Sequence, residues 1–457
     1  DSPSFASVVY STGTGDDFPG TRPCFMQPLC GQPVLLHTLK TTRDAAGSPA
    51  ILIVDQEVET LSGRDFPLDD LVVIPGRFNP IEVLESRFTG NTEHLLLVLA
   101  DLPLLTASTL RELKAAHTAP TKLDQSQPVI TIAYFWSSES SPHHGINRGD
   151  RDQILGIAHR EEIIAEPKEQ QEYSAGVYCI AANWLWEIKS QIPGSLTLNN
   201  LLSNLVQAAK TLDRPIQSFL IEDLTETLKI ESLVDLSHAE TNLRLRTNHN
   251  LMRSGVRISD PTTTDIGVQV EVGKDTVIQP NTYLRGKTRI GQGCLIGPNS
   301  MILNTEIGNR CEVTFSVAEN AVMEDDVDIG PFAHLRKGAH LARGVHMGNY
   351  GEVKNSYLGP GTKMGHFSYI GDANIGADVN IGAGVITANY DGSRKYPTEI
   401  GAGAFIGSDT MLVAPLKIGA GARTGAGSVV TKDVPPNSLA VGTPARIIRK
   451  KEEEDGS

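Results

Sequence analysis

The sequence predicts two structural halves, an α/β sheet domain followed from about residue 255 by a parallel β-helix. In the second half, small aliphatic residues recur every sixth position, usually with Gly behind them. Pairs in this register include Val272-Gly273, Ile290-Gly291, Ile296-Gly297, Ile370-Gly371, Ile375-Gly376, Ile381-Gly382, Ile400-Gly401, Ile406-Gly407 and Ile418-Gly419. A six-residue period fits neither a helix nor an alternating strand, and it is typical of a parallel β-helix. Each hexamer then forms one side of a triangular coil, with its aliphatic residue inward and Gly or Asn at corners that need positive φ.

The first half alternates between strand-like and helix-like segments. Apolar runs typical of strands cover residues 5–10, 50–54, 95–99, 129–133 and 175–181, and helical patterns cover residues 107–116 and 198–212. This order predicts a mostly parallel sheet covered by helices. We therefore expect four segments: a sheet domain over 1–228, a connecting helix over 229–254, a β-helix over 255–447 and a charged tail over 448–457.

The composition and net charge argue against several classes of function. The chain has 457 residues and a net charge of −14, which argues against nucleic acid or an anionic membrane as the main partner. Its five Cys have no paired or metal-like spacing, so buried or free thiols in a reducing compartment are expected. No apolar run approaches the roughly 20 residues that span a bilayer. The sequence begins at Asp1 and shows no signal peptide, and we expect a cytoplasmic protein.

Three cations interrupt the otherwise neutral coils of the second half. Arg336, Lys354 and Lys395 fall in stretches rich in hydrogen-bonding residues. Arg offers a phosphate planar bidentate contacts and Lys offers it a point charge, so three such cations in one cleft would suit a phosphate. The alternative is that all three are solvated surface residues.

His366, in MGHFSYIGD, is the candidate general base, because histidine titrates near neutral pH and can take a proton from an attacking amine. Tyr369, Asn380, Asn389 and Tyr390 add polar groups nearby, although a lone His can also be purely structural. His334, His340 and His346 recur six residues apart. We expect that spacing to stack them on one face as surface residues, with metal binding as the less favoured alternative.

The segment NIGAGVITANYDG followed by GSDTMLVAP resembles the acetyltransferase domain of the bacterial bifunctional N-acetylglucosamine-1-phosphate uridylyltransferase/glucosamine-1-phosphate N-acetyltransferase family. The resemblance implies a left-handed β-helix with His366 as base and Glu352 orienting it. It implies that the sugar phosphate is held by Arg336, Lys354, Tyr369, Asn380 and Lys395. It also implies that acetyl-CoA lies along Ala383, Asn389, Tyr390, Ser408 and Ala426. The family's Arg for the coenzyme phosphates falls on Thr443, so Arg446 is the candidate replacement.

The same resemblance implies a homotrimer with each acetyltransferase site between neighbouring subunits. Arg336 and Lys354 would then come from one chain, and Tyr369, Asn380 and Lys395 from the next.

The first half resembles the family's nucleotidyltransferase domain, which is Rossmann-like and begins with a loop of the form LAAGxGTRMxSxxPK. Gly13 and Gly15 keep two of its glycines, but Asp17 stands at the Arg position and Cys24 at the Lys position. Loop amides and these cations would cradle a triphosphate. Asp101 matches the family's magnesium ligand, Gly145 matches a sugar-nucleotide contact, and the second metal ligand falls at about Glu240. The altered charges predict a vestigial nucleotide site.

The main hypothesis is therefore acetyl-CoA-dependent N-acetylation of glucosamine-1-phosphate in UDP-N-acetylglucosamine biosynthesis, without uridylyl transfer. One alternative is a fully bifunctional enzyme that also transfers uridylyl from UTP, and only this alternative requires Mg²⁺. A second alternative makes the first half a non-catalytic scaffold or regulatory module on a sugar acetyltransferase.

Overall fold

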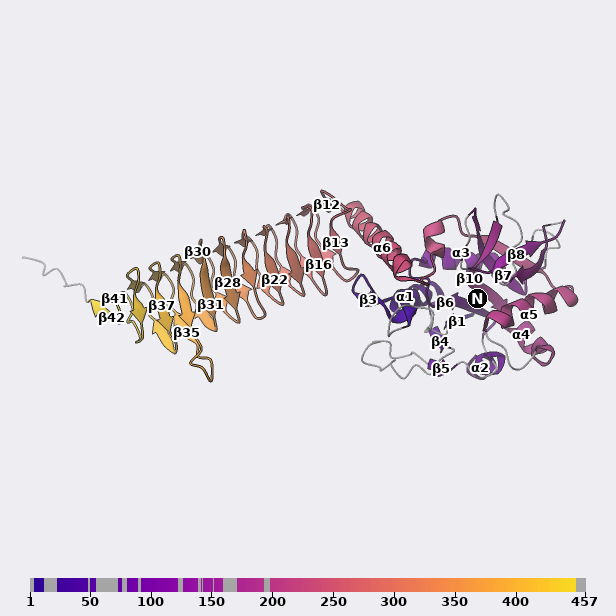
Figure 1. Cartoon of the computed structure of the whole chain (residues 1–457), viewed down its shortest axis with the longest axis horizontal. Helices are drawn as coiled ribbons and strands as arrows, with labels where there is room; N and C mark the ends of the chain where they lie inside the picture. Colours follow the sequence, from indigo (N-terminus) through magenta and orange to yellow (C-terminus); the bar gives the residue numbers. More distant parts are fainter. Residues whose placement is uncertain are drawn as a thin grey trace, which may run out of the picture. The chain divides into compact units, whose positions relative to one another are not determined.

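A computed structural model describes residues 4–11, 23–47, 50–54, 73–75, 80–88, 92–121, 126–138, 141, 143–150, 152–158, 171–192 and 198–448 (Figure 1). The chain divides into two compact units, Asp1–Leu243 and Arg244–Ser457. Helix α6, Leu233–Arg253, contains the division. The two predicted fold classes are confirmed, as the following paragraphs describe.

The first unit is built on one sheet with helices around it. Its main strands, in spatial order, are β11 (Ile216–Leu220), β7 (Ile130–Ser137), β10 (Gln171–Ala181), β6 (His94–Leu99), β1 (Phe5–Tyr10), β4 (Ala50–Val54) and β5 (Val73–Pro75). Strands β1, β4, β5 and β6 run parallel, while β10 is antiparallel to both β6 and β7. Strands β8 (Gly145–Arg148) and β9 (Ile154–Ala158) form an antiparallel pair beside β10.

Helices cover this sheet because its strands are apolar on both sides. In β1 and β6, ten of the twelve residues are hydrophobic, and nearly all are buried. The helices are α1 (Val34–Ala46), α2 (Pro80–Arg87), α3 (Ala107–Thr118), α4 (Ala182–Ile188) and α5 (Leu198–Thr211). Short 3₁₀ turns cover Cys24–Met26, Lys189–Gln191 and Leu224–Thr227, and a small ladder joins β2 (Pro28–Leu29) to β3 (Gln32–Pro33). Continuous apolar runs of this kind are expected where a parallel sheet is sandwiched between helices.

The second unit is a left-handed parallel β-helix with three flat faces, each one a stack of short strands (Figure 1). Face one comprises β12 (Arg257–Ile258), β15 (Val277–Ile278), β18 (Leu295–Ile296), β21 (Glu312–Val313), β24 (Asp328–Ile329), β27 (His346–Met347), β30 (Lys363–Met364), β33 (Asn380–Ile381), β36 (Phe405–Ile406), β39 (Arg423–Thr424), β41 (Leu439–Gly442) and β42 (Ala445–Ile448).

Face two comprises β13 (Asp265–Ile266), β16 (Tyr283–Arg285), β19 (Met301–Leu303), β22 (Val317–Glu319), β25 (His334–Leu335), β28 (Gly351–Lys354), β31 (Ser368–Gly371), β34 (Ile386–Ala388), β37 (Met411–Val413) and β40 (Val429–Val430). Face three comprises β14 (Glu271–Val272), β17 (Arg289–Ile290), β20 (Glu306–Ile307), β23 (Val322–Met323), β26 (His340–Leu341), β29 (Tyr357–Leu358), β32 (Ala373–Ile375), β35 (Thr398–Ile400) and β38 (Leu416–Ile418).

The inward side chains of the three faces form one continuous apolar core. Ile266, Ile278, Leu284, Ile296 and Ile302 are all fully buried, as the six-residue pattern predicts. Truncating one such side chain to Ala typically costs about 2–5 kcal/mol, because the removed atoms leave a cavity. Helix α6 closes the beginning of this core, and the Asn248 side-chain amide donates to the carbonyl oxygens of Pro261 and Thr264 at 2.9 Å.

The expected stacking of three histidines on one face is wrong. His334 lies on β25 of face two, His340 on β26 of face three and His346 on β27 of face one. Six residues advance the chain by one face, whereas stacking within a face requires a full coil: Asp328 on β24 is in register with His346, 18 residues later. Each histidine pairs with a carboxylate of the preceding coil, namely Glu319, Glu324 and Asp328 respectively.

Candidate active site

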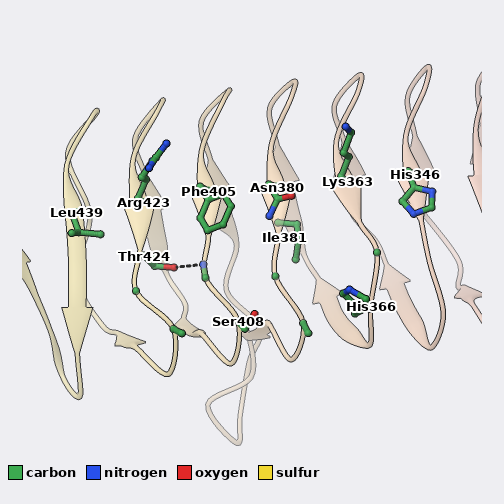
Figure 2. A pocket seen from close by; sticks show the side chains of 16 residues that line it. His346, Lys363, His366, Asn380, Ile381, Phe405, Ser408, Arg423, Thr424 and Leu439 are labelled. Carbon is green, nitrogen blue, oxygen red and sulfur yellow. Dashed lines mark hydrogen bonds between the residues drawn. The ribbon is translucent and has the colours of Figure 1, made fainter.

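A cavity lies beside His366 on the β-helix. It has a volume of about 740 Å³ and gathers five of the predicted site residues, His366, Asn380, Ala383, Ser408 and Ala426. They come from successive coils, at face one and at the corner that follows it (Figure 2). His366 itself occupies the corner between β30 and β31 and is exposed to solvent. The cavity is therefore open to a ligand along the coil axis, with an imidazole at one end.

Some backbone amides around the cavity are engaged in hydrogen bonds, and others, that of Ala383 among them, have no acceptor among the described residues. The Ala383 carbonyl oxygen accepts from the Asp409 amide at 2.6 Å, and the Gly407 amide donates to Thr424 Oγ1 at 2.9 Å. The Gly384 amide donates to the Phe367 carbonyl at 2.7 Å. Among the described residues no acceptor is found for the Ala383 amide. A free amide pointing to a reacting carbonyl is the group that stabilises an oxyanion.

The predicted cations lie together on face two, outside that cavity. Arg336 follows β25, Lys354 ends β28, and Tyr369 is on β31. The neighbouring ammonium group of Lys395 lowers the pKa of Lys354, and Arg336 adds to that effect. The mutual repulsion of Lys354 and Lys395 favours an anionic ligand beside them.

One expected relationship in this cluster, that of Glu352 with His366, differs from the structure. Glu352 accepts a hydrogen bond from Arg336 Nη1 at 2.7 Å, and in the described part of the chain it has no hydrogen bond with His366. Register explains this, because Glu352 on β28 lies opposite His334 and Tyr369, whereas His366 precedes the strand that contains Tyr369. The pairing with Glu352 raises the pKa of Arg336, and Tyr369 also contributes.

The expected division of the cations between subunits stays a prediction, because the structure describes a single chain. Lys354 and Lys395 influence each other within one chain, and Tyr369 lies close enough to Arg336 to affect it. The loop that bears Lys395 closes into a hairpin, because Tyr390 and Lys395 form an antiparallel bridge. One chain therefore brings Arg336, Lys354, Tyr369 and Lys395 together.

The remaining predicted coenzyme residues are placed elsewhere. Asn389 is buried and donates to Asp372 Oδ2 at 2.5 Å. The Tyr390 hydroxyl donates to the Gly392 carbonyl at 2.6 Å, at the exposed loop. Arg446 lies on β42 opposite Val441, is exposed, and is not among the residues that line the cavity.

Several cavity residues were missed from sequence. They are His346, Lys363, Phe405, Arg423, Thr424 and Leu439, which line the same hollow (Figure 2). The signal was present, because His346, Lys363 and Asn380 follow one another at 17-residue steps, one coil apart. The chain between Asn389 and Lys395 lengthens the next coil, which hides the step to Phe405.

The other candidate site is at the carboxyl end of β6 in the first unit. Asp101 Oδ1 is buried and has no hydrogen-bond partner among the described residues. Burial raises the pKa of Asp101 to about 6, against the opposing effect of Lys229. The Ile230 amide donates to the Asp101 carbonyl at 3.1 Å, so the segment before α6 passes directly over this end of the sheet.

Glu231, and not Glu240, is the second carboxylate at this place. Lys229 Nζ lies 2.6 Å from Glu231 Oε1, and both groups act electrostatically on Asp101. The Glu240 carbonyl instead accepts a weak hydrogen bond from the Cys30 thiol, at 3.7 Å. Glu240 lies on α6, beyond the segment that passes over Asp101.

Of the predicted nucleotide loop, Gly13, Gly15 and Asp17 lie outside the described residues. Cys24 is described, and burial raises the pKa of its thiol to about 12, so it is neutral near pH 7. Gly145 begins β8 and is paired with Tyr173 of β10.

The carboxyl end of β6 offers only part of a magnesium site. Mg²⁺ usually takes one or two carboxylates and completes its shell with water and substrate phosphates. Asp101 offers an unpartnered carboxylate oxygen, whereas Glu231 is neutralised by Lys229. The described residues contain no ready-made group of three His, Cys, Asp or Glu side chains for a metal. Asp101 would thus hold the ion only together with a bound substrate.

Comparison with known proteins places the chain in a family. A bacterial transferase hexapeptide repeat model (six repeats) matches residues 269–304, and a model of the hexapeptide repeat of succinyl-transferase matches residues 397–432. The bifunctional protein GlmU of Carboxydothermus hydrogenoformans is 40% identical over 451 residues, covering 96% of this chain and 98% of that protein. The chain belongs to the bifunctional GlmU family.

Other GlmU proteins agree over the same length. Those of Thermotoga petrophila and Pelobacter propionicus are 34% and 33% identical, and in each case 97% of both chains is covered. These relatives include the sheet half and are named bifunctional. The alternative of two activities is therefore better supported than the expectation of acetyl transfer alone. No helix among the described residues is long and apolar enough to cross a membrane.

Proposed function

We propose that residues 255–447 transfer acetyl from acetyl-CoA to the amine of glucosamine-1-phosphate. The observation that carries this proposal is the cavity with His366 at one end, lined by Asn380, Ala383, Ser408 and Ala426. Its length along the coils suits a long thin donor such as coenzyme A. The cation cluster of Arg336, Lys354 and Lys395 suits the phosphate of the acceptor.

The chemistry follows from these positions. The acceptor amine attacks the thioester carbonyl carbon, and His366 takes the proton that the amine loses. The Ala383 amide, which has no acceptor among the described residues, donates to the oxyanion. The carbon–sulfur bond then breaks, and the coenzyme thiolate leaves and is protonated. Holding amine and thioester side by side supplies much of the rate.

A homotrimer is part of this proposal, supported by an exposed aromatic row at the corner before face two. Phe332, Tyr350 and Phe367 are 51%, 60% and 55% exposed, and the row ends beside His366. The rings of Phe332 and Tyr350 stack at 5.2 Å. Both residues have positive φ, which is rare for bulky side chains and persists where the surroundings require it. A second copy covering this row would bring new groups to the His366 end of the cavity.

Thiol release tests the acetyl transfer. Purified chain, acetyl-CoA and glucosamine-1-phosphate are mixed, and free coenzyme thiol is measured with a chromogenic disulfide. Thiol release that requires the amino sugar supports the proposal. Release that is equally fast without the acceptor, or is unchanged in His366→Ala, contradicts it.

For residues 1–228 we propose uridylyl transfer from UTP to N-acetylglucosamine-1-phosphate, the second activity. Two observations favour it: the bifunctional name of full-length relatives, and the unpartnered Asp101 oxygen at the carboxyl end of β6. Mg²⁺ held by Asp101 would neutralise phosphate charge, while the sheet edge orients the substrates. Pyrophosphate release from UTP with Mg²⁺ tests it, with Asp101→Asn as the control. Cys24 and Asp17 in place of two cations predict a rate below that of acetyl transfer.

A further inference from the structure

We propose that Arg423 binds a phosphate group of the acetyl donor, with the Phe405 ring as the platform for its guanidinium. This rests on the proposed use of acetyl-CoA. Thr443 stands at the family's Arg position, and Arg446 is exposed on β42 outside the cavity lining. The cavity itself contains two cations, Lys363 and Arg423.

The two cations belong to a row of outward side chains on face one. Lys363 is in register with Asn380, Asn380 with Phe405, and Phe405 with Arg423. Figure 2 shows these side chains on successive strands, with His366 at the corner of the coil that holds Lys363. The row therefore runs from the reacting end of the cavity toward its far end.

Of the two cations, Arg423 lies at the distance from the His366 coil that the phosphates of the donor would reach. Neighbouring strands are about 4.8 Å apart, so the three steps from β30 to β39 span ~14 Å. The pantetheine arm has two amides and short alkyl links, about the length of four extended residues, or ~14 Å. With the thioester at His366, the phosphates would reach the coil of Arg423. Lys363 lies on the coil of His366 and is too close to the thioester for that task.

The Arg423 guanidinium contacts an aromatic ring and forms no ion pair among the described residues, so it can bind an anion. Its guanidinium carbon lies 5.8 Å from the Phe405 ring centroid, and it forms no ion pair with any described residue. Stacking on an aromatic ring fixes the planar guanidinium while leaving its N–H groups at the edge free for two phosphate oxygens.

Calorimetric titration tests this with coenzyme A, 3′-dephospho-coenzyme A and pantetheine as ligands. Arg423→Gln should weaken coenzyme A binding about 10- to 100-fold, the usual effect of losing a charge-assisted contact. Pantetheine has no phosphate, so its affinity should change by less than about twofold by the same reasoning. Arg446→Gln is the matched control and should leave all three affinities unchanged. Loss with both coenzymes assigns the pyrophosphate, and loss with coenzyme A alone assigns the 3′-phosphate.

Two results overturn the inference. One is coenzyme A affinity in Arg423→Gln equal to that of the wild-type chain. The other is an equal loss for pantetheine, which indicates a structural role. Failure of the proposed function looks different: wild-type chain would then bind neither coenzyme A nor pantetheine, before any substitution is made.

Discussion

The ammonium group of Lys229 lies 2.6 Å from the Glu231 carboxylate, beside the unpartnered oxygen of Asp101. Burial opposes the charged form of Lys229, but Asp101 and Glu231 outweigh that effect and raise its pKa. The carboxyl end of β6 thus has its own cation before any metal or substrate arrives.

Lys229→Met should therefore destabilise the first unit by about 1–3 kcal/mol, since two carboxylates lose their partner in a poorly hydrated place. Chemical denaturation measures the change. Adding Glu231→Gln should restore part of the lost stability, because one uncompensated charge is removed. An unaltered denaturation midpoint in Lys229→Met would show that solvent already screens the pair.

Asp101→Asn should raise the stability of the first unit while it lowers uridylyl transfer. The pKa of Asp101 is raised to about 6, above its usual 3.8, so ionisation costs folding free energy as pH rises through 6. At pH 7 the Asn variant should be more stable by roughly 1–3 kcal/mol. It should also lose Mg²⁺-dependent pyrophosphate release. Thermal melts at pH 5 and pH 7 check the sign: the gain must be larger at pH 7.

His366→Ala should lower kcat for acetyl transfer by about 10²–10⁴-fold, the usual value for a positioned base. His366 is exposed at a corner, so its removal leaves no cavity in the core and coenzyme binding should persist. Steady-state kinetics measures kcat, and calorimetry measures coenzyme binding. His346→Ala, on β27 of face one and also lining the cavity, is the comparison variant and should retain most of the rate. If both variants lose activity equally, His366 is not the base.

Lys395→Met should change how the acceptor KM depends on pH. Lys395 lowers the pKa of Lys354, so in the wild-type chain Lys354 loses its proton at a lower pH than an ordinary lysine. KM for the sugar phosphate should rise as pH passes that value. Without Lys395 the pKa of Lys354 returns upward, so the rise moves to higher pH while KM is larger throughout. Measuring the acceptor KM over a series of pH values tests this. A pH profile of KM that is the same in Lys395→Met as in the wild-type chain would show that Lys395 does not affect the pKa of Lys354.

Acid should weaken the first unit through His143. Burial lowers the pKa of His143 to about 4, and its Nε2 lies 2.8 Å from the Thr227 carbonyl oxygen. The unfolded chain binds the proton more tightly, so this contribution is complete above pH 6.5 and is lost between pH 6.5 and 4. The loss should approach about 3 kcal/mol. His143→Gln should flatten the pH dependence of unfolding over that interval.

The fold of both halves was predictable because their patterns are local. An aliphatic residue every sixth position places Ile278, Leu284 and Ile296 inside the coil whatever lies around them, and all three are fully buried. Of the predicted site, His366, Asn380, Ala383, Ser408 and Ala426 meet in one cavity. Each of these five residues was predicted from a short segment that resembles a motif of the family.

Tertiary structure alone decided which groups face one another. Coil length varies, from 16 residues between Glu312 and Asp328 to 25 between Asn380 and Phe405, so the period does not show which residues are neighbours on successive coils. This is why the pairing of Glu352 with Arg336 and the stacking of Arg423 on Phe405 were missed. The meeting of Lys229, Glu231 and Asp101 joins segments about 130 residues apart. Sequence period determines which side of a strand faces the core, but contacts between coils and across sheet ends depend on register, and register is set by the whole fold.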